Sequence, residues 1–170
     1  MHKCRASRAI KERRSIRSFL DKSIKNPTIN TILEAGRWAP SGLNNQPWRF
    51  VIVGNKAAKE RISECTHYSH IVRRSAALIL VFLDRDNSYN LIKDAQAVGA
   101  CIQNMLLRAF ELKVSSCWLG EILNQKAKVN KIINLKSRYD LMAAIALGYS
   151  NKKSKSSRLP LKKLVLKSIT

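Results

Sequence analysis

Apolar and polar residues follow one another along this chain in patterns that predict several β-strands. The longest purely apolar stretch, Ala76 to Leu83, has the length of a strand that is buried on both faces of a sheet. Shorter apolar runs predict strands over residues 49–54, 114–119 and 141–149. We therefore expect a sheet of about four strands, antiparallel or mixed.

Apolar residues spaced three and four positions apart predict helices between these strands. The helical segments are residues 6–13, 56–65, 91–112 and 125–135. A further helix starts at Asn26-Pro27, with Asn26 as its N-cap, and ends at Pro40. Residues 13–19 are expected to be extended and residues 84–88 to form a turn.

The longest predicted helix, residues 91–112, is largely apolar on two faces. The first face carries Ala95, Val98, Ile102, Met105, Ala109 and Leu112. The second carries Ala97, Ala100, Cys101, Asn104, Leu107 and Arg108. Small residues around Gly99 would let another backbone approach closely. We expect one face to pack on the sheet and the other on a partner subunit.

Length and element order together predict one α+β domain over residues 1–170. Residues 151–170 are rich in Lys and Ser, and we expect a basic tail that lies on a surface and ends in a short strand over 161–168. Whether this tail crosses to a partner subunit is left open.

The composition argues against a membrane-spanning protein, a disulfide-bonded protein and a metal-binding protein. The chain is 45% hydrophobic and has no apolar run near the ~20 residues of a membrane span, and no apolar segment follows the basic N-terminus. We therefore expect a cytoplasmic protein that does not span a membrane. The cysteines at 4, 65, 101 and 117 form no Cys-x-x-Cys pair, and His67 with His70 is too small a set for a metal site, so we expect free thiols and no metal.

The net charge of +21 is unevenly distributed. Residues 1–17 hold seven basic groups against Glu12 alone, and residues 151–170 hold seven with no acid. Such clusters are typical of a solvated surface or of an anion-binding patch, and both nucleic acid and a phosphorylated cofactor remain candidate ligands.

The segment "RRSIRSF" offers a specific anion site. In an extended chain Arg13, Ser15 and Arg17 would point to one side, and Arg14 and Ile16 to the other. Guanidinium groups are suited to phosphate, although a solvated basic edge explains the spacing as well. A second basic cluster contains Arg158, and the spacing does not show whether the two clusters meet.

Several motifs are absent, and their absence limits the chemistry. There is no Gly-x-Gly-x-x-Gly, no Gly-x-x-x-x-Gly-Lys-Ser/Thr and no Gly-x-Ser-x-Gly. No pair of carboxylates stands out for hydrolysis. A reaction in this protein would therefore be carried by a bound cofactor that the chain positions.

Three motifs in their order along the chain resemble the nitroreductase family of FMN-dependent oxidoreductases. They are "RRSIRSF", "APSGLNNQPW" and "DAQAVGACIQNMLLRAFELKVSSCWLG", with a weaker match at "KSSRLP". The resemblance spans residues 10–160 and implies the family's fold. That fold is a mainly antiparallel sheet of four to five strands flanked by helices, with the long central helix at a dimer interface.

The resemblance also implies roles for the matched residues. Arg13, Ser15 and Arg158 would hold the FMN phosphate, and Arg17 would lie near the N1/O2 edge of the ring. The backbone N–H of Gly120 would point at flavin N5. Residues of the loop 39–48 would reach the flavin from the other subunit. The full set of implied cofactor-binding residues is Arg13, Arg14, Ser15, Arg17, Pro40, Ser41, Asn44, Gln46, Leu119, Gly120 and Arg158.

The implied activity is that of a homodimeric FMN-dependent oxidoreductase. NAD(P)H would be the transient reductant, and a nitroaromatic, quinone or similar electrophile would be the small-molecule acceptor, in ping-pong order. The chain differs from larger members of the family in two ways. Few residues separate 83 from 91, where larger members insert a segment that covers the active site, and Ser156 stands where some members have a Lys.

Two alternative functions remain. One is a flavin store or sensor without turnover, and the other is a basic nucleic-acid-binding protein, which the 6% aromatic content disfavours.

Overall fold

The structure, a computed structural model, describes residues 5–169 and contains a four-stranded sheet. The strands are β1 (Trp48–Val53), β2 (Ala77–Asp84), β3 (Ser115–Leu119) and β4 (Tyr139–Gly148). They lie in the order β1-β2-β4-β3, and each neighbouring pair is antiparallel. The predicted α+β fold with a mainly antiparallel sheet is confirmed.

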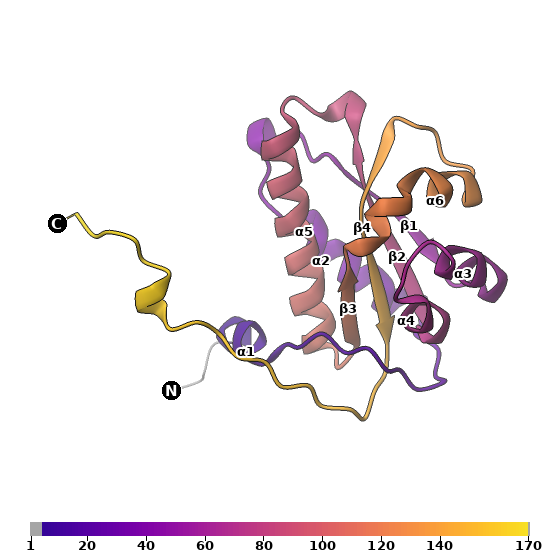
Figure 1. The fold of residues 1–170 in the computed structure, drawn as a ribbon, viewed down its shortest axis with the longest axis horizontal. Helices are drawn as coiled ribbons and strands as arrows, with labels where there is room; N and C mark the ends of the chain where they lie inside the picture. Colours follow the sequence, from indigo (N-terminus) through magenta and orange to yellow (C-terminus); the bar gives the residue numbers. More distant parts are fainter. Residues whose placement is uncertain (1–4, 170) are drawn as a thin grey trace.

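Helices cover both faces of this sheet (Figure 1). One face carries α2 (Asn26–Arg37) and α5 (Leu91–Glu111), with α1 (Arg5–Glu12) against α5. The other face carries α3 (Lys56–Ser63), α4 (Ser69–Arg74) and α6 (Lys126–Ile132). Short 3-10 turns are η1 (Gly42–Asn44), η2 (Arg85–Asn87), η3 (Glu121–Gln125) and η4 (Leu161–Lys163). None of the described helices is long and apolar enough to cross a membrane.

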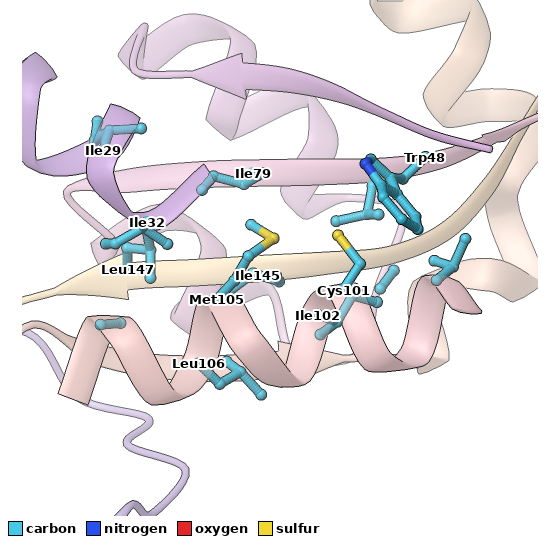
Figure 2. Packing of buried hydrophobic residues seen from close by; sticks show 14 of the residues in the cluster. Ile29, Ile32, Trp48, Ile79, Cys101, Ile102, Met105, Leu106, Ile145 and Leu147 are labelled. Atoms are coloured by element: carbon cyan, nitrogen blue, oxygen red, sulfur yellow. The ribbon is translucent and has the colours of Figure 1, made fainter. Parts of the chain in front are cut away.

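Strand β2 joins the two hydrophobic clusters, because all of its residues are buried. Successive side chains of a strand point to opposite faces. Ile79, Val81 and Leu83 therefore enter the cluster beneath α2 and α5, and Leu78, Leu80 and Phe82 enter the cluster beneath α3, α4 and α6. Figure 2 shows part of the first cluster, including Ile79. This double burial explains the uninterrupted apolar run in the sequence.

Helix α5 packs on the sheet with one side and is more exposed on the other. Its buried side includes Cys101 and Met105, and α2 crosses it at Gly36, where an added Cβ would lie 2.7 Å from Met105 Cγ. On its outer side Gly99 is only half-buried, and an added Cβ there would meet nothing within 4 Å. A glycine in a helix interior costs about 1 kcal/mol relative to alanine. Since the Cβ of an alanine would fit at position 99, packing within this chain does not explain why a glycine is there.

The buried carboxylate of Asp94 ties the loop 39–48 to the start of α5. Its Oδ1 accepts a hydrogen bond from Asn45 Nδ2 at 2.8 Å. Its Oδ2 accepts from Ser88 Oγ at 2.7 Å and from the backbone N–H groups of Tyr89 and Asn90 at 3.0 and 3.2 Å. Burial alone would raise the pKa of Asp94, but these hydrogen bonds outweigh it and lower that pKa.

Some predicted details are wrong. Helix α2 takes Asn26 as its first residue, and Lys25 is the N-cap, because the Lys25 carbonyl accepts the first helical hydrogen bonds. The segment 161–168 forms no strand: residues 151–169 are exposed, and the tail runs away from the sheet edges (Figure 1). Helix α4 was not predicted, because its six residues are too few for a helical period to emerge.

Asp94→Asn should lower the free energy of unfolding by about 2 kcal/mol at pH 7, since a charged acceptor of several buried donors becomes a neutral one. The folded-state pKa of Asp94 lies below its unfolded value, so its contribution is present above about pH 4 and is lost as the pH falls through the folded pKa. The stability difference between wild type and variant should therefore shrink in acid. Urea unfolding at several pH values measures it, and a difference that grows in acid would contradict this assignment.

Candidate functional site

The extended segment after α1 runs beside the edge strand β3. Ser15 and Ser116 form a parallel β-bridge, and the Ile16 N–H donates to the Ser116 carbonyl at 2.9 Å. Ile16 packs on the cluster beneath α3, α4 and α6, and Phe19 is buried there. These apolar side chains fix the segment, so that its arginines lie over the start of β3.

This segment and the basic tail line one pocket of about 310 Å³. From the first come Arg13, Arg14, Ser15 and Arg17, and from the second Ser154, Lys155, Ser156 and Arg158. The structure thus brings the two basic clusters together, which the spacing alone did not show. Among residues 5–169, no carboxylate lies within ion-pair distance of any cation in this pocket.

Arg13 is the most constrained of these cations. Its Nε is buried and has no hydrogen-bond partner among the described atoms. Burial, followed by the charges of Arg158 and Arg14, lowers the pKa of Arg13. A buried donor without an acceptor, surrounded by like charge, is an unfavourable arrangement that an anion in the pocket would relieve.

The expected alternation of side chains fails at Arg14. Its guanidinium turns back to donate to the carbonyls of Lys11 and Arg13, at 2.6 and 2.9 Å, and it lines the same pocket as Arg13. The reason is that the Arg13 N–H still donates to Ala9, so the chain is leaving α1 and is not yet a strand. Regular alternation therefore does not apply before Ser15.

The loop 39–48 has a strained backbone. Leu43, Asn44 and Gln46 adopt positive φ angles of 54°, 54° and 45°. The Gln46 N–H donates to Ser41 Oγ at 3.0 Å, and Arg49 Nη1 donates to the Gln46 carbonyl at 3.0 Å. The loop is thus held from several directions, while the Asn44 side chain stays on the exposed side.

The loop and the cationic pocket lie at opposite ends of α5. Asn45 is bound to Asp94 at the first turn of the helix. At the other end, Arg13 and Arg14 line a larger groove of about 900 Å³ together with Glu111 and Leu112. A helix of 21 residues is about 30 Å long. Pro40, Ser41, Asn44 and Gln46 are therefore not brought to the cations within one chain.

Gly120 follows the last residue of β3 and is exposed, whereas Leu119 is buried. Among the described residues no acceptor receives the Gly120 N–H, and an added Cβ would meet nothing within 4 Å. Gly120 lies four positions beyond Ser116, which corresponds to about 13 Å along a strand. The strand therefore connects the cationic pocket to a free, unobstructed N–H donor.

Thiol and metal chemistry find little support in the described residues. Cys65, Cys101 and Cys117 are buried free thiols, and burial raises the pKa of Cys101 to about 12. Within residues 5–169 no group of three or more His, Cys, Asp or Glu side chains is placed to hold a metal ion. Cys4 and His2 lie outside the described residues.

Sequence reasoning missed several residues near these features. Asn45 and Asp94 anchor the loop, Lys155 lines the cationic pocket, and Glu121 binds the segment that precedes α4. Asp94 was the one detectable case, since it is the single acid within residues 91–110. The others stand among many polar residues of the same type and carry no periodic signal.

Comparison with known proteins identifies a family. The sequence model described as "Nitroreductase family" matches residues 10–67 and 63–149. A candidate NADH dehydrogenase/NAD(P)H nitroreductase of Methanothermobacter thermautotrophicus is 30% identical over 145 residues, which cover 83% of this chain and 75% of that protein. One of Archaeoglobus fulgidus is 29% identical over 140 residues, which cover 81% and 80%.

A solved structure is similar over almost the whole chain. It is a candidate nitroreductase from Desulfovibrio desulfuricans in complex with FMN, and it is 44% identical to this chain. The match covers 99% of both chains with a TM-score of 0.95. Taken with the family match over residues 10–149, it leads to one assignment: this chain belongs to the nitroreductase family.

Proposed function

We propose that two copies of this chain bind FMN between the cationic pocket of one copy and the loop 39–48 of the other, and that the protein is an FMN-dependent oxidoreductase. The observation that carries the proposal is the cationic pocket itself: among the described residues, the buried Arg13 Nε has no hydrogen-bond partner, and none of the cations in the pocket forms an ion pair with a carboxylate. Phosphate is the anion that such guanidinium donors bind best. The similar Desulfovibrio desulfuricans protein was solved with FMN.

The residues of this chain fit FMN in two further respects. The unobstructed N–H of Gly120 offers a hydrogen-bond donor about 13 Å from the Ser15–Ser116 bridge, a separation comparable with the length of FMN. Arg17 also lines the cationic pocket and would supply a cation near the ring. Arg13, Arg14, Ser15 and Arg158 would hold the phosphate, and Leu119 would set the position of Gly120.

The chemistry that FMN would supply there is hydride transfer from NAD(P)H to a nitroaromatic, quinone or similar electrophile, in ping-pong order. The chain's own contribution is to bind, orient and stabilise charge. A cation fixed in advance beside a group that gains negative charge stabilises the charged state without reorganisation. A flavin store or sensor would share these residues but would lack turnover with NAD(P)H.

The separation of the two half-sites along α5 supports a homodimer. Pro40, Ser41, Asn44 and Gln46 can complete the site only from a second copy. The exposed outer side of α5 around Gly99 and the exposed apolar residues of the tail offer surfaces for that second copy. We infer that the tail crosses to the partner subunit, since Leu159, Leu161 and Leu166 contact nothing that buries them in their own chain.

Arg13→Ala should weaken FMN binding by about 10- to 100-fold, because the loss of a charged hydrogen bond costs about 1.5–3 kcal/mol. Riboflavin, which lacks the phosphate, should bind wild type and variant almost equally. Arg73→Ala removes an exposed arginine paired with Glu60 and serves as the control. Flavin fluorescence titration measures all affinities. If Arg13→Ala weakened both ligands equally, the phosphate assignment would be rejected.

Gly120→Val should leave the thermal midpoint within about 3 °C of wild type, since its side chain enters open space in this chain. It should weaken both FMN and riboflavin by at least about tenfold, because the side chain would occupy the space of the ring. Gly54→Val is the matched control, as an added Cβ there also meets nothing within 4 Å. Equal flavin affinity in the two variants would show that the ring does not approach Gly120.

Mixed dimers test whether one site is shared by two chains. Arg13→Ala and Asn44→Ala should each weaken FMN binding at both sites of the homodimer. A mixed dimer of the two variants, purified with two different tags, should regain one intact site, because one interface then combines an unaltered pocket with an unaltered loop. FMN content per purified dimer is the measurement. No recovery in well-folded mixed dimers would mean that both halves act within one chain.

A further inference from the structure

The groove of about 900 Å³ at the end of α5 is a second concave site beside the cationic pocket. The two share Arg13, Arg14 and Ser154 in their linings. The groove is also lined by residues 110–116, which lead from α5 into β3, whereas Gly120 follows the other end of that strand. The groove therefore extends from the cationic pocket toward the beginning of β3 and not toward Gly120.

The walls of this groove carry an excess of positive charge. Two carboxylates line it, those of Glu12 and Glu111, against seven cations. The cations are Arg8, Arg13, Arg14, Arg108, Lys113, Lys152 and Lys153. In the part of the chain that the structure describes, no carboxylate forms an ion pair with Lys113, Lys152 or Lys153. These exposed ammonium groups are available to an anion that carries several charges.

The two carboxylates occupy only part of the donor capacity of the arginines. Arg8 donates from Nε to Glu12 at 2.9 Å. Arg108 donates from Nη1 to Glu111, also at 2.9 Å. A guanidinium group has five N–H donors, so each arginine keeps most of its donors for a ligand. A chain of phosphates matches such clustered donors better than a single carboxylate does, because it offers several charged acceptors over a short length.

The groove also has an apolar part. It is formed by Ile16, Phe110, Leu112 and Val114. Phe110 is half-buried and belongs to neither of the two hydrophobic clusters, so its ring is not needed for the packing of the core. An aromatic ring in this position can pack on a planar base. A ligand with a phosphate chain and a planar ring system would therefore contact both the charged and the apolar part of the groove.

Lys113 has a backbone conformation that favours glycine. It directly follows the C-cap of α5 with a φ of 58°, and its N–H donates to the Phe110 carbonyl at 3.0 Å. Glycine is the usual residue at this position, because it has no Cβ to clash in the left-handed region. The lysine keeps a strained backbone and places a free ammonium group in the lining of the groove. This strain points to a role for the side chain and not to a requirement of the fold.

We propose that this groove binds a nucleoside polyphosphate, such as ATP, at a site separate from the flavin. The phosphates would contact Lys113, Lys152 and Lys153, and the base would lie on Phe110. The volume of about 900 Å³ falls within the range of about 300–1,000 Å³ for sites of small ligands. A nucleic-acid strand would need a longer basic surface, so a groove of this size favours a free nucleotide. The site does not need the flavin, and the inference does not depend on the proposed function.

Lys113→Gly tests the site without damage to the fold. In protein saturated with FMN, the variant should bind ATP about 5- to 20-fold more weakly, because a charged contact to phosphate is lost. Glycine relieves the strained backbone, so the thermal midpoint without ATP should rise by about 2–4 °C. Isothermal titration calorimetry and thermal unfolding measure the two effects. The affinity for FMN should stay within about twofold of wild type.

Matched variants separate the effect of charge from that of the backbone. Asn134→Gly relieves a similar conformation after α6, with a φ of 52°, and Lys131→Ala removes an exposed charge from α6. Both should bind ATP like wild type. Phe110→Leu should weaken ATP about 3- to 10-fold and leave the affinity for tripolyphosphate, which has no base, unchanged.

The outcomes decide between this site and its alternatives. Wild-type protein that does not bind ATP, or Lys113→Gly protein that binds it equally well, would overturn the proposal. ATP that binds only the FMN-free protein would also overturn it, since the nucleotide would then occupy the cationic pocket. Tripolyphosphate that binds as tightly as ATP would reject the base contact, and a single-stranded oligonucleotide that displaces ATP at a tenth of its concentration would assign the groove to nucleic acid. Wild-type protein that binds ATP but no FMN would reject the proposed function and support the nucleotide site.

Discussion

The arrangement of the candidate site depends on α5, because this long, rigid helix keeps the residues at its two ends apart. The helix is anchored at its start by Asp94 and the loop 39–48, and at its end by α1 and the cationic segment that follows it. A helix packed along its length does not bend to bring its ends together. The cations and the amide-rich loop of one chain therefore remain about 30 Å apart, so the proposed site would need the loop of a second copy.

The loop 39–48 has a strained backbone that the rest of the chain supports, and this would suit the intermolecular role proposed for it. Non-glycine residues with positive φ, such as Leu43 and Gln46, cost about 1–3 kcal/mol each and persist only when their surroundings impose them. Here Asp94, Arg49 and Ser41 impose them through hydrogen bonds. A loop that is already held in this conformation loses little entropy when it meets a ligand.

Much of the fold could be predicted from the sequence, because elements that are buried on two faces have a recognisable pattern of apolar residues. β2 and α5 were found within one or two residues, since a continuous apolar run and a long three-four period have few alternative explanations. The cationic residues were found from their clustering, but their convergence was not, because Arg158 reaches Arg13 through a tail without periodicity. Glu121 and Thr66 were missed, since a hydrogen bond between residues more than fifty positions apart leaves no local pattern.

Anion binding at the basic termini and the ordering of the C-terminal tail are coupled. Arg158 of the tail and Arg13 beside β3 share one pocket although their charges repel, and burial, followed by this repulsion, lowers the pKa of Arg13. A doubly charged phosphate in that pocket would attract both Arg13 and Arg158 and would offset the repulsion between them. Because such a ligand binds only the folded arrangement, its binding free energy adds to the stability of that arrangement. The cofactor proposed for this site would therefore fix the start of the tail as well as carry the chemistry.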